Sequence, residues 1–381
     1  MSFTVRSISA AEHLVYLSGR GSSFLQTPAW ALVKSEWRGE SIGWFDAEEV
    51  LCGTGLVLYR KVPRLNRYLA YLPEGPSIDW SPKAVNDHLR ALTDYAATQR
   101  AFAVRVGPPV VSRRWNAATL KTAMADAALH RLDDVPADVS DHEALSVVDA
   151  LQADGWRKVS TDGGFAAGQP QYNFWLPLVD DDGAPRTEEQ LLAGMNQLWR
   201  RNIRKAEKAG VEVSAGERTD LADFHRIYVE TADRDHFTPR PLAYFEQMWD
   251  ALTAEDPDRL RLYLAHHDGD LVAATTMVRV GGHAWYSYGA STTHKRDVRG
   301  SNAIQWQMMR DALAGGAEIY DMRGITDTVS SDDAHAGLLQ FKVGTGGQAV
   351  EYLGEWDLPL NRGLYAAFIV WMKRRAKGGE A

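Results

Sequence analysis

The sequence predicts a mixed α/β (α+β) protein made of two tandem domains, and three observations lead to this prediction. The chain has 381 residues, more than a single domain usually contains. Its first half alternates β-type runs with a helical pattern, and a second round of strands and helices begins at Gly155-Trp156. We therefore expect a first domain at 1–150 and a second at 151–345. The segment 346–381 is expected to complete the first domain, because only a short connector separates its strand pattern from its helix pattern.

The first domain is expected to open with an aromatic-rich segment and to continue as strands and helices. The basic turn RKVPRLNR separates two predicted strands, and a run of Phe, Ala and Val indicates a buried strand after the first long helix. The segment 112–151 reads as helical or irregular. The expected elements are strands at 50–58, 68–72 and 102–106 and a helix at 82–99.

The second domain carries longer helical patterns and an antiparallel strand group. Gly210 is a good residue to end the first helix, and the turn HDGD links two strands. The order of elements resembles that of a GNAT acyltransferase domain, so each half is expected to be GNAT-like. The expected helices are 188–209, 221–234, 242–253 and 303–314, with strands at 260–266, 271–280, 284–288 and 319–322.

Composition excludes several classes of protein. With 42 Lys plus Arg against 50 Asp plus Glu, the net charge is −8, which argues against a whole surface that coats nucleic acid. The single cysteine, Cys52, excludes an intramolecular disulfide and a cysteine-rich zinc site. The N-terminus lacks a signal-peptide pattern, and the apolar run 364–372 is too short to span a bilayer. We expect a cytoplasmic protein, with at most a peripheral contact to the inner face of the membrane.

One helical segment is unusually basic. LWRRNIRKAEKAG contains five cations and a single acid, Glu207, and helical spacing places the cations in two adjacent i, i+4 rows. The alternative is a solvated helix face, but such faces generally mix charges of both signs. We therefore consider phosphate recognition at least as well supported as a solvated helix face. The five cations are Arg200, Arg201, Arg204, Lys205 and Lys208.

Other motifs carry less information. The basic loop THKRDVRGSNAIQWQ leads into a helix at Gly300, where backbone amides can hold an anion. In acetyl-CoA-using GNAT enzymes this loop follows a Q/R-x-x-G-x-G/A pattern, which only Arg299-Gly300 approximates, so the loop argues against a CoA donor. No HExxH, G-x-S-x-G or P-loop pattern occurs, so metalloprotease, hydrolase and NTPase functions lose their main support.

Several segments, in order and spacing, resemble the Fem family of FemX/FemAB-type peptidyltransferases, which use aminoacyl-tRNA. The most specific are R-x-N-I-R-K-A-x-K-x-G within 198–213 and L-x-x-F-K-x-x-x-G-G within 338–361. The resemblance spans most of the chain. It implies two tandem GNAT-like domains in the compact form without a coiled-coil insertion. Aminoacyl-tRNA would be the co-substrate, with no cofactor and no metal, and the acceptor would be a peptidoglycan precursor, lipid II or UDP-MurNAc-pentapeptide. No stable protein partner is implied.

The resemblance also implies roles for individual residues. Phe341 and Lys342 match the family's catalytic pair: Lys342, kept cationic, would neutralise the developing oxyanion or a donor phosphate, and Phe341 would shape the pocket. By itself, Lys342 would be interpreted as an exposed lysine at a strand end. The acceptor's diphosphate needs converging cations or donors. The residues that would bind the acceptor are Lys34, Arg240 and Tyr244, with one of Tyr286 and Tyr288.

One position departs from the family pattern. Family members often have Asp-Pro where this chain has Gly107-Pro108, and that aspartate is a candidate general base. Either Asp235 or Glu230 substitutes, or the proton leaves through the tRNA ribose hydroxyl or water, or the acceptor is a different one. We favour the substrate-assisted route.

Three other functions remain open. The acceptor could instead be a biosynthetic peptide such as an antibiotic intermediate, which Gly107 mildly favours. The chain could also be an acyl-CoA N-acyltransferase. Finally, it could be an RNA-binding or scaffold protein that uses only the basic helix. The transferred amino acid, the acceptor residue and the oligomeric state do not follow from the sequence.

Overall fold

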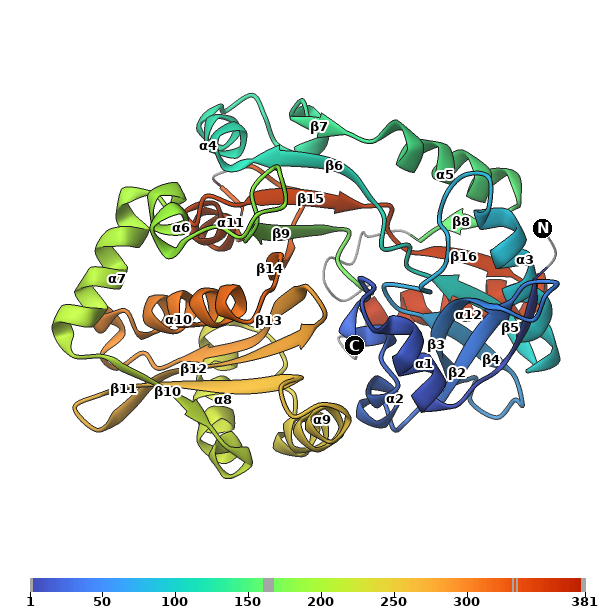
Figure 1. The fold of residues 1–381 in the computed structure, drawn as a ribbon, viewed down its shortest axis with the longest axis horizontal. Helices are drawn as coiled ribbons and strands as arrows, with labels where there is room; N and C mark the ends of the chain where they lie inside the picture. Colours follow the sequence, from blue (N-terminus) through green and yellow to red (C-terminus); the bar gives the residue numbers. More distant parts are fainter. Residues whose placement is uncertain (1–2, 160–167, 331, 334, 378–381) are drawn as a thin grey trace. The chain divides into compact units, whose positions relative to one another are not determined.

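The computed structural model describes residues 3–159, 168–330, 332–333 and 335–377 (Figure 1). The chain folds into two compact units: unit 1 is Met1–Arg114, Ala137–Tyr172 and Val350–Ala381, and unit 2 is Trp115–Pro136 and Asn173–Ala349. We predicted a boundary near Ala150, but this residue lies in α5 (His142–Ala153), and unit 1 continues to Tyr172. The C-terminal segment returns to unit 1 at Val350, close to the predicted 346.

Unit 1 is built on a seven-stranded sheet with the order β1-β2-β3-β4-β5-β16-β8. Its pairs are antiparallel except for the parallel pair β4–β5. The strands are β1 (Thr4–Ser7), β2 (Arg38–Phe45), β3 (Leu51–Lys61), β4 (Tyr68–Leu72), β5 (Ala101–Val106), β16 (Trp356–Pro359) and β8 (Arg157–Lys158).

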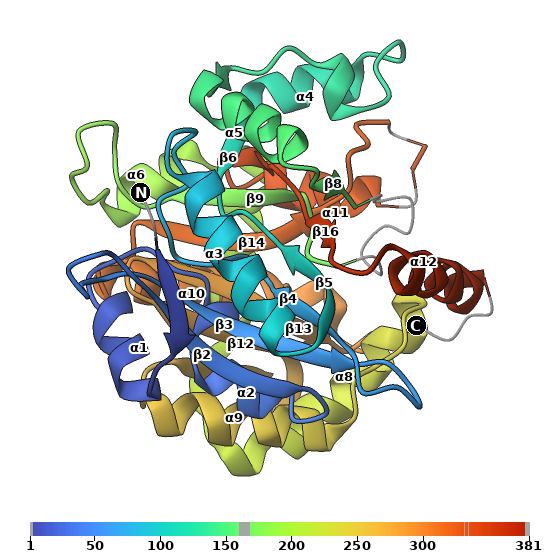
Figure 2. The ribbon, with the colours of Figure 1, turned by 90° about the vertical axis from the view of Figure 1, so that its right-hand side faces the viewer.

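Helices cover both faces of this sheet, as Figure 2 shows. Leu89 and Leu92 of α3 and Val147 of α5 pack on the face that carries Val104. Phe368 packs on the opposite face, against Leu69 and Phe102. Neighbouring strand residues point to opposite faces, so the two buried clusters lie on either side of one sheet. The helices of unit 1 are α1 (Ala10–Leu17), α2 (Ala29–Val33), α3 (Val85–Thr98), α5 and α12 (Arg362–Lys377).

Unit 2 is built on a second sheet with the order β10-β11-β12-β13-β14-β9-β15-β6. The pairs from β10 to β13 are antiparallel, and β13 pairs with β14 in parallel. At the Arg113–Arg114 end of β6, within unit 1, β7 (Val139–Ser140) adds a short pair. The strands are β10 (Glu212–Gly216), β11 (Leu260–His267), β12 (Asp270–Val280), β13 (His283–Ser291), β14 (Ile319–Ile325), β9 (Tyr172–Pro177), β15 (Gln348–Tyr352) and β6 (Val111–Asn116).

The helices of unit 2 sandwich the antiparallel part of its sheet. In Figure 1, α10 lies on one side of β11–β13, and α8 and α9 lie on the other. Phe224 of α8 and Phe245 of α9 form a buried cluster with Leu262 and Leu264 of β11. The helices are α4 (Ala117–Ala125), α6 (Glu188–Gly194), α7 (Gln197–Ala209), α8 (Leu221–Asp235), α9 (Leu242–Glu255), α10 (Gly300–Ala314) and α11 (Ala336–Val343).

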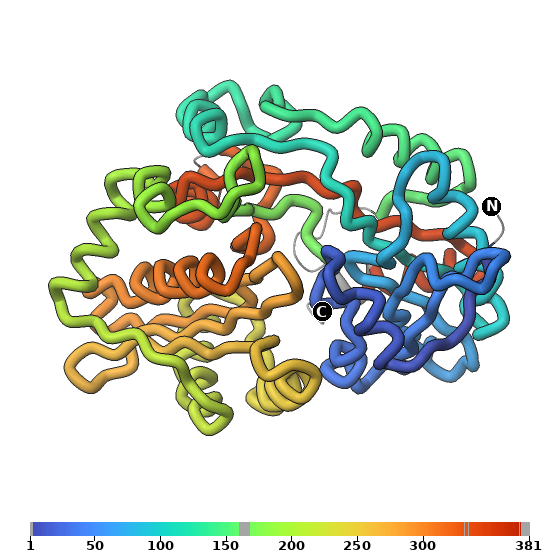
Figure 3. The backbone as a smooth tube through the Cα atoms, in the orientation of Figure 1, coloured from blue at the N-terminus to red at the C-terminus, as the bar shows by residue number. Residues whose placement is uncertain are grey.

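The predicted mixed α/β fold class is confirmed, and the structure contains two sheets, while three local predictions need correction. The single helix expected at 188–209 is two helices, because Asn196 accepts a hydrogen bond from the Trp199 amide (2.9 Å) and starts a new helix after Gly194. Figure 3 shows the turn between them. The segment 112–151, read as helical or irregular, also contains β6 and β7. Lys342 lies in a helix, α11, and not at a strand end.

Two further observations bear on the overall architecture. Among the described residues, the longest helix is α12 with 16 residues, so this part of the chain contains no coiled-coil arm. None of the helices in the described part of the chain combines the length and the apolar character that a membrane crossing requires.

Candidate functional site

Unit 2 contains a cavity of about 450 Å³ beside the start of α10. The end of α8, the strands β12 and β13, and the loop 292–299 form its walls. Asn202 of the basic helix α7 and Phe341 of α11 also line it. The structure thus brings Asn202 of the basic helix and Phe341 of the Phe-Lys pair to a single cavity.

The cavity is lined by four cations, Arg234, Lys295, Arg296 and Arg299, and by one acid, Asp235. The Arg299 Nε is buried and has no hydrogen-bond partner among the residues that the structure describes. A buried guanidinium nitrogen without an acceptor is unfavourable, and an anion in the cavity would supply the acceptor. The lining therefore favours a negatively charged ligand.

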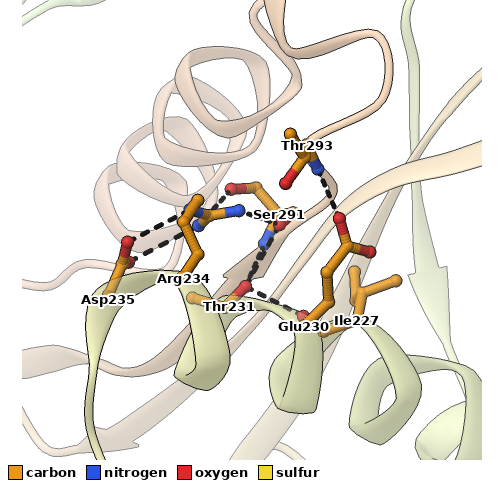
Figure 4. A network of polar contacts seen from close by, with 7 residues as sticks. All are labelled: Ile227, Glu230, Thr231, Arg234, Asp235, Ser291 and Thr293. Atoms are coloured by element: carbon orange, nitrogen blue, oxygen red, sulfur yellow. Dashed lines mark hydrogen bonds and ion pairs between the residues drawn. The ribbon is translucent and has the colours of Figure 1, made fainter.

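Contacts along the wall fix the shape of this basic lining. Arg234 donates to the Ser291 carbonyl (2.8 Å) and Oγ (3.3 Å), and its Nε lies 3.1 Å from Asp235 (Figure 4). Lys295 forms an ion pair with Asp270 at 2.8 Å. Arg234 is therefore held in place by groups of its own unit, as a preorganised cation.

The start of α10 lies directly against the sheet. A Cβ at position 300 would meet the Val272 Cγ2 at 2.8 Å, so glycine allows this close approach. Arg299 precedes it in the left-handed conformation, with φ 68°, and no side chain caps the helix. An uncapped helix N-terminus beside a basic cavity is a favourable place for an anion. The loop that looked weak as a sequence motif therefore forms a wall of this cavity.

Glu230 and Asp235, the two acids considered as general bases, have local partners in Figure 4. Glu230 accepts a hydrogen bond from the Thr293 amide at 2.6 Å, which anchors the loop 292–299. Asp235 pairs with Arg234 and lines the cavity. Of the two, only Asp235 lines this cavity.

Lys342 is buried at the C-terminal turn of α11, with 3% of its surface exposed. Its Nζ donates to the carbonyls of Gly324 (2.7 Å) and Arg323 (3.1 Å) at the end of β14. Burial lowers the pKa of Lys342 from 10.5 to about 7. The prediction that Lys342 is an exposed lysine is wrong, because its side chain is buried. The expectation that it stays cationic also needs correction, because a pKa of about 7 lets the cationic and neutral forms coexist near neutral pH.

A buried carboxylate organises the turn that holds Lys342. Asp321 accepts a hydrogen bond from the Arg323 amide (2.6 Å), and Arg323 has φ 63°, which turns two successive carbonyls toward Lys342. Asp321 also lies 3.3 Å from His283 and accepts from the Trp175 Nε1 at 3.2 Å. Burial would raise the pKa of Asp321, but His283 and Arg323 outweigh it and hold the pKa below its usual range.

Phe341 connects the basic helix to the Lys342 turn. The Trp199 indole of α7 donates to the Phe341 carbonyl at 2.7 Å, and the two rings lie 4.7 Å apart. A side chain at Gly344 would collide with Trp199, so glycine lets α7 pack directly on the end of α11. The basic helix is therefore fixed relative to Phe341 and Lys342.

The five predicted cations of α7 are not equivalent. Arg200 is half-buried and donates to the Ala193 carbonyl (3.2 Å) at the end of α6. Arg201, Arg204 and Lys208 are exposed. Lys205 is also exposed and lies 3.8 Å from Asp297 in the loop that borders the cavity. Arg200 thus has a structural contact, and the other four form a basic surface next to the cavity.

The predicted acceptor residues of unit 2 fall into two places. Arg240 lies 5.1 Å from the Tyr244 ring, and the Tyr244 and Tyr288 hydroxyls are 3.1 Å apart. Tyr286 instead lines the cavity, and burial raises its pKa to about 12. A register shift between Thr276 and Met277 interrupts the β12–β13 pairing here, and this irregularity lets the side chains of Tyr286 and Tyr288 lie in different environments. Tyr288 is therefore the tyrosine that accompanies Arg240.

In unit 1, Lys34 follows α2, and its Nζ lies 5.9 Å from the Trp30 ring. The same segment places Trp37 6.1 Å from Tyr71. The ring of Trp30, from the same motif, therefore lies beside Lys34.

Sequence reasoning missed two buried acids, Asp321 beside Lys342 and Glu355 in unit 1. A Cβ at Gly107 would lie 3.8 Å from the Glu355 Cγ. Glu355 accepts a hydrogen bond from the Tyr71 hydroxyl and lies 3.7 Å from Arg105. Burial raises its pKa against the effect of Arg105 and Tyr71. A carboxylate thus lies beside the position where family members carry aspartate. The sequence did contain one signal for Glu355, namely its position within the segment 338–361 that resembles the Fem family.

The burial of Lys342 predicts a pH-dependent stability. Because its pKa falls from 10.5 to about 7 on folding, the unfolded chain binds one more proton between these values. Stability then rises with pH by about 1.4 kcal/mol per unit, and the full penalty is present below pH 7. We expect the unfolding free energy of wild type, measured with urea across this window, to rise relative to that of Lys342→Met. A difference that is independent of pH would contradict the lowered pKa.

Comparisons with known proteins agree with this architecture. A model of the FemAB family matches residues 8–268 and 262–373. Lipid II:glycine glycyltransferase of Staphylococcus aureus (strain MRSA252) is 24% identical, over 94% of this chain and 93% of that protein. The enzyme of the same name from Staphylococcus haemolyticus (strain JCSC1435) is 22% identical over the same shares. The crystal structure of FemX has the same fold, with a TM-score of 0.78 and 22% identity over 95% of this chain and 99% of that one.

Proposed function

Because this chain belongs to the FemAB family and is an aminoacyltransferase, we propose that it transfers an amino acid from aminoacyl-tRNA to an amine of a peptidoglycan precursor. The observation that carries the proposal is the basic cavity of unit 2, which Asn202 of α7 and Phe341 of α11 both line. The name of the staphylococcal relatives, lipid II:glycine glycyltransferase, supports a lipid-linked acceptor. UDP-MurNAc-pentapeptide is the other acceptor of the same class. Aminoacyl-tRNA places the reaction in the cytoplasm.

The donor is assigned to unit 2. A tRNA end carries one phosphate per nucleotide and an ester at its terminal ribose. Arg234 and Arg299 suit a phosphate in the cavity, since guanidinium groups can bind its oxygens through two parallel hydrogen bonds. The exposed cations of α7 then face the phosphates further along the strand. Phe341 lines the cavity and packs against Trp199 of α7, so the aminoacyl end would lie beside it.

The reaction is aminolysis of an ester. The acceptor amine attacks the ester carbonyl, a tetrahedral oxyanion forms, and the ribose oxygen leaves as the amide is completed. The Nζ atom of Lys342 can make three hydrogen bonds, and two of them go to the carbonyls of Arg323 and Gly324. The third can take a proton from the attacking amine when Lys342 is neutral and return it to the leaving ribose oxygen. The ester is already activated, so no covalent enzyme intermediate is required.

In unit 2 the acceptor is assigned to Arg240, Tyr244 and Tyr288, while Lys34 of unit 1 is proposed from the family resemblance of its own motif. We expect Arg240→Met to raise the KM for a diphosphate-bearing acceptor about thirtyfold, because a charge-assisted contact contributes about 2 kcal/mol. The assay measures transfer of the labelled amino acid from aminoacyl-tRNA to UDP-MurNAc-pentapeptide or lipid II, read as a mass shift of the acceptor. Arg226→Met, which changes an exposed arginine of α8 paired with Asp223, is the matched control and should keep the wild-type KM. Equal KM values for both variants would remove Arg240 from the acceptor site.

A second candidate keeps the donor and replaces the acceptor by a biosynthetic peptide. Gly107 favours it, because an altered acceptor site could tolerate the loss of the family's aspartate. The same assay separates the two: transfer to a peptide antibiotic intermediate, combined with failure on every murein precursor, would reject the first proposal. An acyl-CoA donor would instead be revealed by a rise in Tm on addition of CoA.

A further inference from the structure

Unit 1 has a second basic surface, far from the cations of α7 in sequence and absent from the function proposed above. It consists of residues 60–67, which are the end of β3 and the turn to β4, and of the helix α12. We call it the hairpin–α12 face (Figure 2). The turn RKVPRLNR contains four cations, residues 362–377 contain five, and neither segment contains Asp or Glu. These nine cations stand out in a chain whose net charge is −8.

The two segments form one piece of structure. Val62 of the turn belongs to the same apolar cluster as Phe368 and Ile369 of α12. The Arg60 guanidinium lies 5.5 Å from the Trp371 ring, and its Nη1 lies 3.9 Å from the Met372 sulfur. These contacts fix the turn against the helix, so the two basic segments belong to one piece of structure.

Exposed apolar side chains stand among these cations. Leu65, between Arg64 and Arg67, is 44% exposed, and Val370 of α12 is 50% exposed. Arg64, Arg67 and Arg374 are exposed as well. A folded protein gains little by exposing large aliphatic side chains to water beside basic segments. The combination suits the headgroup region of an anionic bilayer, where cations meet lipid phosphates and apolar side chains enter the acyl boundary.

We propose that the hairpin–α12 face docks on an anionic lipid bilayer. The charge of the face is complementary to such a surface, whereas the acidic remainder of the chain is repelled by it. Docking would hold unit 1 at the membrane, where a lipid-linked acceptor is found. This consequence rests on the proposed function, while the docking itself does not.

The test is co-sedimentation of the full chain with vesicles of phosphatidylcholine alone or with about one third phosphatidylglycerol. We expect binding to the anionic vesicles only, weakened by salt. Arg64→Glu/Arg67→Glu should reduce it more than tenfold, and Leu65→Ser/Val370→Ser should also reduce it, each with an unchanged Tm. Lys83→Glu/Lys121→Glu, with the same change in net charge at exposed sites elsewhere, is the control and should bind as wild type.

Transfer assays separate this proposal from the proposed function. Arg64→Glu/Arg67→Glu should keep transfer to UDP-MurNAc-pentapeptide in solution and lose transfer to lipid II in vesicles. Vesicle binding without transfer to any acceptor would leave docking supported and reject the function. Equal binding to both vesicle types, or an unchanged affinity of the Arg64→Glu/Arg67→Glu variant, would overturn docking. So would loss of tRNA affinity in place of vesicle affinity, which would make the face an RNA surface.

Discussion

Replacement of Lys342 by methionine is expected to lower the rate of amino acid transfer about a thousandfold, the scale of a lost proton-transfer group. Methionine keeps the length and apolar character of the lysine stem in a site that is 3% exposed. The change leaves the carbonyls of Arg323 and Gly324 without their Nζ donor, but it also removes a buried charge. The fold should therefore persist. Single-turnover transfer from labelled aminoacyl-tRNA measures the chemical step, and the Tm verifies folding.

The pH profile distinguishes the two roles of Lys342. If its neutral form takes the proton of the attacking amine, kcat/KM rises with pH through about 7, the value to which burial lowers its pKa. If a cation is required, activity falls over the same range. We expect the rise, and we expect it to be absent from the residual activity of Lys342→Met. Lys121→Met, at an exposed lysine of α4, is the control. Wild-type turnover in Lys342→Met would remove this residue from the mechanism.

Local signals explain why most elements were predictable. The strands β11, β12 and β13 carry β-type runs bounded by Gly-containing turns, and their antiparallel pairing follows from those short turns. The end of α7 was equally clear, since Gly210 adopts φ 78°, which glycine accommodates without strain. These features depend on neighbouring residues, so one sequence is enough to locate them.

Long-range features were not predictable in the same way. The pKa of Lys342 depends on burial under a turn that Asp321 fixes, and no local pattern encodes this arrangement. Likewise, Glu355 approaches Gly107 because β16 pairs with β5, a contact between distant parts of the chain. The assignment of 115–136 to unit 2 has the same origin. Family resemblance found the Phe341–Lys342 pair, but the environment of that pair required the fold.

Reversal of two charges on α7, Arg201→Glu/Arg204→Glu, is expected to weaken tRNA binding about a hundredfold and to reduce the slope of log K against log salt by about two. Both side chains are exposed. The helix should remain folded, because each new glutamate lies four residues before a lysine, Lys205 or Lys208, in the favourable orientation. Filter binding of aminoacyl-tRNA at several salt concentrations measures both quantities.

The control for the α7 variant changes the net charge equally without touching the basic helix. Lys121→Glu/Arg226→Glu alters two exposed cations of unit 2 and should bind tRNA with nearly wild-type affinity and slope. The long-range field of the chain changes equally in both variants, so a difference between them measures local phosphate contacts on α7. If both lose affinity equally, α7 contributes only to the general field. In that case the donor's phosphates would have to be held by the cavity cations alone, and Arg299→Met would become the variant that abolishes binding.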